Sequence, residues 1–142
     1  MTYHVVVGVD GSTYGNAALR WALHEATVHQ GELTAVFAWQ MPFLEIPGAF
    51  DVDLIEDQAK AFLTETVAAV DPSPKVLVTL LVAHGDVSES LIEASRAADL
   101  LVLGSRGRGG FAGLKLGSVS QECVTHASCP VVIIKDDGLQ PD

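Results

Sequence analysis

The sequence predicts an α/β fold: a five-stranded parallel sheet in the strand order 3-2-1-4-5, with helices on both faces. Two observations support this prediction. Five short runs are nearly continuous in Val, Leu and Ile, which is typical of strands covered on both faces. Segments with helical periodicity separate these runs, and the alternation favours right-handed crossovers in a doubly wound sheet. In such a sheet the order reverses between the first and fourth strands, so a ligand is expected beyond their carboxyl ends.

The five strands are expected where the apolar runs lie. Their residue ranges are 5–9, 33–39, 76–83, 100–103 and 131–134. The first range leads into Asp10-Gly11-Ser12 and the fourth into a glycine-rich segment. The predicted strand order therefore brings these two segments to one place.

The first two helices are expected to follow the first two strands. The first begins at Ser12 or Thr13 and closes at Gly31. The second spans residues 53–70 and stops at Asp71-Pro72. The apolar face of the first, at the spacing i, i+3, i+4, i+7, comprises Leu19, Ala22, Leu23 and Ala26. One face of the second comprises Ile55, Ala59, Phe62, Thr66 and Val70.

The third and fourth helices are expected in the second half of the chain. The third spans residues 88–97. The fourth begins at Ser118, because Ser118 and Gln121 have the Ser-x-x-Gln spacing of a capping box. It ends before Pro130, since proline cannot continue a helix.

Composition predicts one domain, spanning residues 1–142. The chain has 142 residues, 49% hydrophobic and 18% charged, which suffices for one core. Its formal charge of −10 disfavours nucleic acid and anionic membranes as partners. No apolar run approaches the roughly 18 residues of a membrane span, so a soluble, unprocessed protein is expected. The two cysteines, Cys123 and Cys129, lack the CxxC spacing of a zinc site and suit a reducing, cytoplasmic location.

A short glycine-rich, basic segment stands out in this acidic chain. Six of the 13 glycines and three of the eight basic residues lie within residues 104–117. The segment leaves a predicted strand and enters a predicted helix, where backbone N–H groups and the positive end of the helix dipole favour an anion. We therefore expect it to bind a phosphate chain. The alternative is a solvated turn that only connects the two elements.

Side chains beside the glycine-rich segment are expected to help bind the phosphate chain. Ser118 and Ser120 would add hydroxyl donors at the helix start, and Arg106 or Arg108 would offset ligand charge. A Walker loop is disfavoured because the chain has no Gly-Lys pair, and a G-x-S-x-G nucleophile elbow is absent. A relaxed dinucleotide fingerprint, Gly107-x-Gly109-x-x-Ala112, is a weak match because it follows the fourth strand rather than the first.

The chain resembles the universal stress protein family, of the ATP-binding type. That family's signature reads Gly, two residues, Gly, nine residues, Gly and then Ser or Thr. Here the anchors are Gly104, Gly107, Gly117 and Ser118, and Asp10 supplies the aspartate that the family places after its first strand. The resemblance extends from the first strand to Ile134. It implies a Rossmann-like fold of the adenine nucleotide alpha-hydrolase-like type.

The resemblance implies an adenine-nucleotide site. Residues 104–110 would wrap the ribose and phosphates, residues 117–120 would close on the triphosphate, and residues 8–10 would line the adenosine. Ala38 would read the adenine through its backbone, and Asp10 would bind the ligand, cap a helix or turn beside Ser12, or do both. The implied nucleotide-binding residues are Gly8, Val9, Asp10, Ala38, Gly104, Ser105, Arg106, Gly107, Arg108, Gly109, Gly110, Gly117, Ser118, Val119 and Ser120.

The function implied by the resemblance is an ATP-binding, nucleotide-dependent sensor or regulator in the stress response. Hydrolysis would be slow at most, because no Glu or His is obviously placed as a base beside the glycine segment. No protein metal site is expected, and Mg²⁺ would only accompany the nucleotide. The resemblance also implies a homodimer through the last strand, residues 131–134, an apolar edge that invites pairing.

Two alternatives stay open. One is a slow ATPase, or a protein that prefers a cyclic or shorter adenine nucleotide. The other is a dimeric interaction module with a vestigial nucleotide site, in which the irregular residues 40–50 contact an unknown protein partner.

Overall fold

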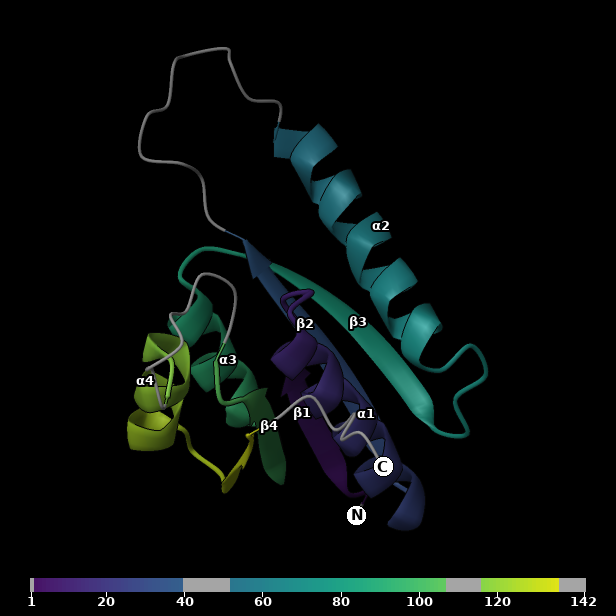
Figure 1. Cartoon of the computed structure of the whole chain (residues 1–142), viewed down its shortest axis with the longest axis vertical. Helices are drawn as coiled ribbons and strands as arrows, with labels where there is room; N and C mark the ends of the chain where they lie inside the picture. Colours follow the sequence, from purple (N-terminus) through teal and green to yellow (C-terminus); the bar gives the residue numbers. More distant parts are fainter. Residues whose placement is uncertain (1, 40–51, 107–115, 136–142) are drawn as a thin grey trace.

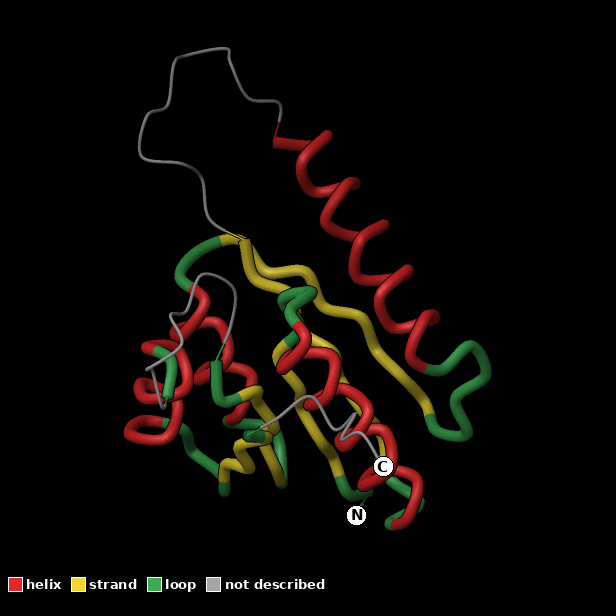
Figure 2. The backbone as a smooth tube through the Cα atoms, in the orientation of Figure 1, coloured by secondary structure: helices red, strands yellow, loops and turns green. Residues whose placement is uncertain are grey.

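The fold comes from a computed structural model that describes residues 2–39, 52–106 and 116–135. Strands and helices alternate along these residues (Figures 1 and 2). The elements are β1 (His4–Gly8), α1 (Thr13–Val28), β2 (Glu32–Trp39), α2 (Val52–Val70), β3 (Leu77–His84), α3 (Val87–Ser95), β4 (Leu100–Gly104), α4 (Ser118–His126) and β5 (Val131–Ile134). Predicted and observed bounds agree to within two residues, except that α1 ends three residues before Gly31 and α4 ends at His126, four residues before Pro130. The predictions for residues 40–50 and for residues 107–115 fall outside the described residues.

The sheet has the order β3-β2-β1-β4-β5, and every pair of neighbours is parallel. This confirms the predicted fold class and strand order. Alternate residues of β1 face opposite sides of the sheet. Val5 and Val7 pack in a cluster with α1 and α2, whereas Val6 packs in a second cluster with α3 and α4. The predicted two-faced coverage is therefore correct for the central strands.

The prediction does not hold for β3 within the described residues, which cover only one of its faces. Val78 and Val82 pack against the cluster formed with α2, but the cluster formed with α3 and α4 contains no residue of β3. As a result Leu77 is 67% exposed and Leu81 is 43% exposed. The reason is topological, because β3 is the edge strand farthest from β4 and α3 packs on the central strands.

The buried face of α2 also differs from the predicted one. Ala59 is buried as expected, but the other buried residues of the described helix are Leu63 and Val67, at the i, i+4, i+8 positions from Ala59. The predicted Phe62 lies beside this row and is half-buried, with its ring centroid 4.8 Å from that of Phe37 in β2. Ile55, Thr66 and Val70 are likewise half-buried. The buried face is thus rotated about the helix axis relative to the predicted face. Hydrophobic periodicity indicates which side of a helix is apolar but does not fix the row of residues that contacts the sheet.

The first helix follows its predicted face. The four apolar residues predicted for α1 are all buried, and the hydroxyl of Ser12 caps the helix by accepting from the Gly15 N–H at 2.9 Å. α3 begins one residue earlier than predicted because Asp86 caps it, accepting from the Glu89 N–H at 2.9 Å. Of the helices in the described residues, none is both long and apolar enough to cross a membrane.

Candidate functional site

The carboxyl ends of β1 and β4 lie side by side at the point where the strand order reverses. β1 pairs with β4 in parallel, so the segments that follow Gly8 and Gly104 leave the same edge of the sheet. The chain after β1 enters α1 on one face, and the chain after β4 leads to α4 on the other face. In folds of this class, ligands bind where the chain diverges in this way at the carboxyl ends of the strands.

Asp10 is the polar side chain at the end of β1, and it organises the start of α1. Its Oδ1 accepts from the N–H of Ser12 at 2.9 Å and from the hydroxyl of Ser12 at 2.6 Å. Gly11 has φ of 80°, a conformation that favours glycine. The cap that we gave as one reading of Asp10 is therefore present. Its second oxygen, Oδ2, has no partner within the described residues, so the predicted ligand role remains a prediction.

Gly15 is a residue of this edge that the sequence analysis missed. A Cβ built on Gly15 would lie 2.4 Å from Asp10 Oδ1 and 3.1 Å from Ser12 Oγ. Any larger residue would displace the carboxylate. The spacing Asp-Gly-Ser-x-x-Gly was visible in the sequence, but only the contact explains why the last glycine is there.

The N-terminus of α4 has no side-chain cap within the described residues. Gly117 is the N-cap, with φ of −70° and ψ of 161°, and it has no side chain to offer. The predicted capping box is therefore wrong, because Ser118 is already the first helical residue. The side chain of Gln121 instead donates from Nε2 to the carbonyl of Leu116 at 2.9 Å.

Three backbone N–H groups are left at this helix end. The carbonyl of Gly117 accepts from the Gln121 N–H at 3.0 Å, which begins the helical pattern. In the described part of the chain, no group accepts from the N–H of Ser118, Val119 or Ser120. Together with the helix dipole they present partial positive charge, which an anion would satisfy.

Ser105 and Ser120 hold this helix end against β4. The hydroxyl of Ser120 is buried and donates to the carbonyl of Gly104 at 2.7 Å. The carbonyl of Ser105 accepts from the Gly117 N–H at 2.7 Å, and its own N–H donates to Ile134 at 2.8 Å. In this structure the Ser120 hydroxyl therefore anchors α4 to β4, and its predicted contact with a ligand stays a prediction.

Arg106 is the basic residue that the structure places at this edge. Its Nη2 donates to the hydroxyl of Tyr14, and its guanidinium carbon lies 4.7 Å from the centroid of the Tyr14 ring. Tyr14 belongs to the first turn of α1 and was not among the predicted site residues. Nothing in its sequence position signals this contact, which joins residues 92 positions apart.

The remaining predicted binding residues differ in what each could offer a ligand. Gly8 lets neighbouring elements approach, since a Cβ there would lie 2.8 Å from a methyl group of Leu103 and 3.3 Å from Leu91. The side chain of Val9 is 4% exposed and belongs to the core, so it offers a ligand only its backbone. Ala38 is half-buried in β2, the strand next to β1. The predicted binding residues outside the described part of the chain are Gly107, Arg108, Gly109 and Gly110.

Gly104 is explained by packing as well as by its place at the edge. A Cβ built on Gly104 would lie 2.8 Å from the backbone carbonyl of Tyr14. The start of α1 therefore crosses directly over the end of β4. This close approach is what brings Tyr14 to Arg106.

Both cysteines are free thiols, and Cys123 is fully buried in the cluster between α4 and the sheet. Burial raises the pKa of the Cys123 thiol from 9.0 to about 11, with smaller contributions from the negative charges of Glu122 and Asp86. Burial also raises the pKa of Cys129, and the charge of Asp99 adds to that effect. Neither thiol has the lowered pKa of a reactive cysteine.

The raised pKa of Cys123 predicts a loss of stability at alkaline pH. The folded state holds the thiol proton more tightly than the unfolded state. Its contribution to the free energy of unfolding is therefore complete below pH 9 and is lost as the pH rises from about 9 to about 11. The urea midpoint should fall across this range more steeply in the natural protein than in a Cys123→Ala variant. Equal slopes for the two proteins would contradict the assignment.

No group of three or more His, Cys, Asp or Glu side chains in the described residues is arranged to hold a metal ion.

Comparison with known proteins identifies the family of the chain. The universal stress protein family matches the chain over residues 1–135. Universal stress protein Rv2623 of Mycobacterium tuberculosis is 35% identical over 134 residues, which are 93% of this chain and 45% of that protein. The chain thus spans about half the length of the curated relatives that it matches.

Solved structures share the whole fold. UspA from Lactobacillus plantarum superposes with a TM-score of 0.80 at 24% identity, covering 94% of this chain and 97% of that one. A universal stress protein crystallised in complex with cAMP superposes with a TM-score of 0.70 at 26% identity, covering 95% and 98%. Both the sequence match and the fold lead to one conclusion, that the chain belongs to the universal stress protein family.

Proposed function

We propose that this protein binds adenine nucleotides at the carboxyl edge of β1 and β4, with ATP as its main ligand, and acts as a nucleotide-dependent regulator in the stress response. The observation that carries the proposal is the uncapped N-terminus of α4. The other two helices whose first turns are fully described, α1 and α3, are capped by Ser12 and Asp86. A phosphate group would take the place of the cap that α4 lacks.

The electrostatics of the site suit a small polyanion in an acidic protein. A net charge of −10 repels anions at long range, but that repulsion is screened over about 8–10 Å at physiological salt. At contact distance the N–H groups of residues 118–120 and the helix dipole dominate. Arg106 adds a full positive charge at the same edge. Membership of the family, and the cAMP held by a related protein, support an adenine nucleotide in particular.

A cyclic or shorter adenine nucleotide is the second candidate ligand. The cAMP complex of a structural relative favours it. The three N–H groups at α4 would accept one phosphate as readily as the end of a longer chain, since they recognise oxygen atoms and not the number of phosphates. Preference between ATP and cAMP would depend on how many further phosphate groups the basic side chains contact.

We propose a binding protein rather than an enzyme. Fast hydrolysis requires an oriented water, a metal clamp and stabilised charge on the terminal phosphate. The carboxylate at this edge, Asp10, already accepts two hydrogen bonds from Ser12 at its Oδ1. Mg²⁺ would arrive with ATP and be held by the phosphates. Turnover at ordinary enzyme rates, about 1–1,000 per second, would refute this part of the proposal.

The test is direct measurement of nucleotide binding. Purified protein would be titrated with ATP, AMP, cAMP, adenosine and GTP by calorimetry, and any co-purified nucleotide would be identified by mass spectrometry. We expect ATP to bind, adenosine to bind more weakly, and GTP to bind least. At a concentration about 100 times its Kd, ATP should raise the free energy of unfolding by about 2.7 kcal/mol. If neither ATP nor cAMP binds, the proposed function is wrong, and an interaction module without a nucleotide takes its place.

We further propose that the protein forms a homodimer through β5 and resides in the cytoplasm. β5 ends the strand order and pairs with β4 on one side only in the described sheet, so its other edge is available for pairing with a second copy. Free thiols in Cys123 and Cys129 suit a reducing compartment. Sedimentation of a chain with lysine in place of Val132 or Ile133 would show whether β5 mediates dimerisation.

A further inference from the structure

We infer that Tyr14 is a positioning residue for Arg106: it holds the Arg106 guanidinium at the carboxyl edge of β4 and thereby raises affinity for phosphorylated ligands. The inference rests on the proposed nucleotide site. It adds to that site a residue from a different element, since Tyr14 belongs to the first turn of α1 and Arg106 follows β4.

The contact fixes the guanidinium in two independent ways. The Arg106 guanidinium carbon lies 4.7 Å from the centroid of the Tyr14 ring, within the range of a cation–π interaction. Its Nη2 also donates to the Tyr14 hydroxyl. A contact with the ring face restrains the guanidinium in distance, and the hydrogen bond restrains its rotation. A guanidinium has five N–H donors, so it can bond to a hydroxyl and to a phosphate at the same time.

Tyr14 is itself held firmly enough to position another group. Its backbone crosses over Gly104, at a distance that leaves no room for a Cβ on that residue. The first turn of α1 is further fixed by the Ser12 cap, which accepts from the Gly15 N–H at 2.9 Å. Tyr14 therefore sits on a rigid support at the edge where β1 and β4 end.

Positioning of this kind should affect affinity through entropy. A free arginine side chain must lose rotamer freedom when it binds a phosphate, whereas one that is already restrained loses less. The benefit applies only to ligands that contact Arg106, which are those with phosphate groups. It should be absent for adenosine. This difference separates a positioning role from a role in holding the fold together.

The experiment compares two hydroxyl deletions. Tyr14→Phe keeps the ring and removes the hydrogen bond to Arg106. Tyr3→Phe, at the only other tyrosine of the sequence, makes the same chemical change just before the amino end of β1, far from the carboxyl ends of the strands. There the hydroxyl donates to Glu25 at 3.2 Å. We expect Tyr14→Phe to weaken ATP by about two- to tenfold and to leave adenosine unchanged. Tyr3→Phe should change neither affinity.

A double-mutant cycle tests whether Tyr14 acts through Arg106. Tyr14→Leu removes both contacts and should weaken ATP more than Tyr14→Phe does, but no more than Arg106→Gln does, because an unrestrained Arg106 still carries its charge. In the Arg106→Gln background it should have no further effect. Arg96→Gln is the matched control, because Arg96 lies at the end of α3 in an exposed pair with Glu93. Urea unfolding of each variant checks that it is folded.

The outcomes distinguish this inference from the proposed function. If the natural protein binds no adenine nucleotide, the proposed function fails. If it binds ATP but Tyr14→Leu binds equally well, only the inference fails. Additive effects of Tyr14→Leu and Arg106→Gln would also overturn it, as would an equal loss of ATP and adenosine affinity. Loss of ATP affinity alone, abolished in the Arg106→Gln background, would establish it.

Discussion

Substitution of Gly117 by aspartate should abolish ATP binding, with an affinity loss of at least about 100-fold, and leave the fold intact. Gly117 is the N-cap of α4, and a side chain at this position lies over the N–H groups of the second and third helical residues. An aspartate there would accept from the donors that a phosphate needs. It would also place a negative charge beside the ligand.

The same substitution should not destabilise the protein. The backbone at Gly117 has φ of −70° and ψ of 161°, which any residue adopts, so glycine is not required for conformation. Aspartate is also a better N-cap than glycine by a few tenths of a kcal/mol. We therefore expect ATP affinity to fall while the free energy of unfolding stays equal or rises slightly. A misfolded variant would lose both.

Calorimetric titration and urea unfolding of the Gly117→Asp variant would measure both effects. Gly117→Leu serves as a second variant that blocks the helix end by bulk without adding charge, and it should also lose ATP. A loss in the aspartate variant alone would assign the effect to charge repulsion. ATP affinity within about threefold of the natural value in both variants would show that the phosphate does not bind at α4.

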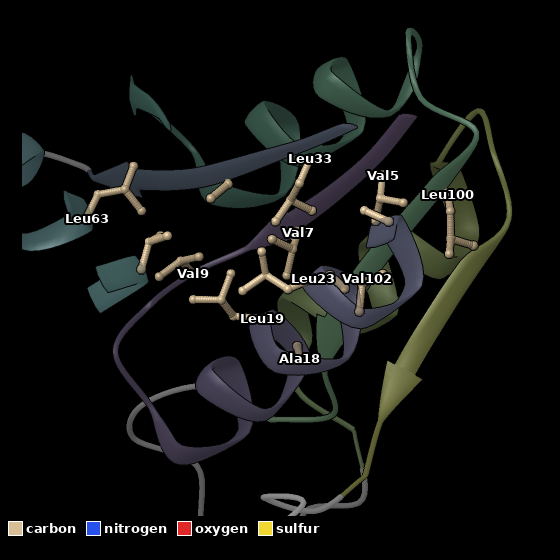
Figure 3. Packing of buried hydrophobic residues seen from close by; sticks show 14 residues of the cluster. Val5, Val7, Val9, Ala18, Leu19, Leu23, Leu33, Leu63, Leu100 and Val102 are labelled. Carbon is tan, nitrogen blue, oxygen red and sulfur yellow. The ribbon is translucent and has the colours of Figure 1, made fainter. Parts of the chain in front are cut away.

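Replacement of Leu19 by alanine should cost about 2–5 kcal/mol of stability. Leu19 is fully buried at the centre of α1, in the cluster with Val7, Val9 and Leu23 (Figure 3). Truncation removes apolar contacts and leaves a cavity that rigid strands on the other side cannot fill. A domain of this size has about 5–15 kcal/mol in all, so the variant would retain a reduced margin.

Leu54→Ala is the matched control, because it makes the same change in a helix at a residue that is 55% exposed. Its effect should stay within about 0.5 kcal/mol. The measurement is the urea midpoint and slope of each variant. Similar losses at Leu19 and Leu54 would mean that the interface between α1 and the sheet contributes less than its burial indicates.

The Ser12 cap and Tyr14 lie at the start of α1, the helix that Leu19 anchors to the sheet. Leu19→Ala should therefore also weaken nucleotide binding at temperatures where the variant begins to unfold.

Most of the fold was predictable because it follows from local patterns. Continuous apolar runs identified the strands of a parallel sheet, and Asp71-Pro72 marked the end of α2. The prediction failed where one local pattern is compatible with two arrangements and only the packing of the elements decides between them. The run in β3 looks like a buried strand, but its position at the sheet edge leaves Leu77 and Leu81 exposed. In α2 the face was rotated towards Leu63 and Val67, because the sheet contacts that row.

The candidate site likewise has features that the sequence indicated and features that it did not. Glycine spacing singled out the segment that we propose to bind phosphate, and the strand order places Asp10, after β1, at the same sheet edge as the end of β4. The spacing Ser118-x-x-Gln121 then suggested a capping box that the helix does not form, since Gly117 takes the N-cap position. Sequence spacing counts residues correctly but does not decide which one of two adjacent residues begins the helix.

The sequence by itself therefore determined the class of fold and the order of strands, because apolar runs and helical periodicity alternate along the chain. Tertiary structure alone decided which donors remain for a ligand. Ser120 gives its hydroxyl to Gly104, while Arg106 is held by Tyr14, 92 residues away. These contacts arise where β1, β4 and the starts of α1 and α4 meet. No local pattern encodes them, since each depends on how separate elements pack in space.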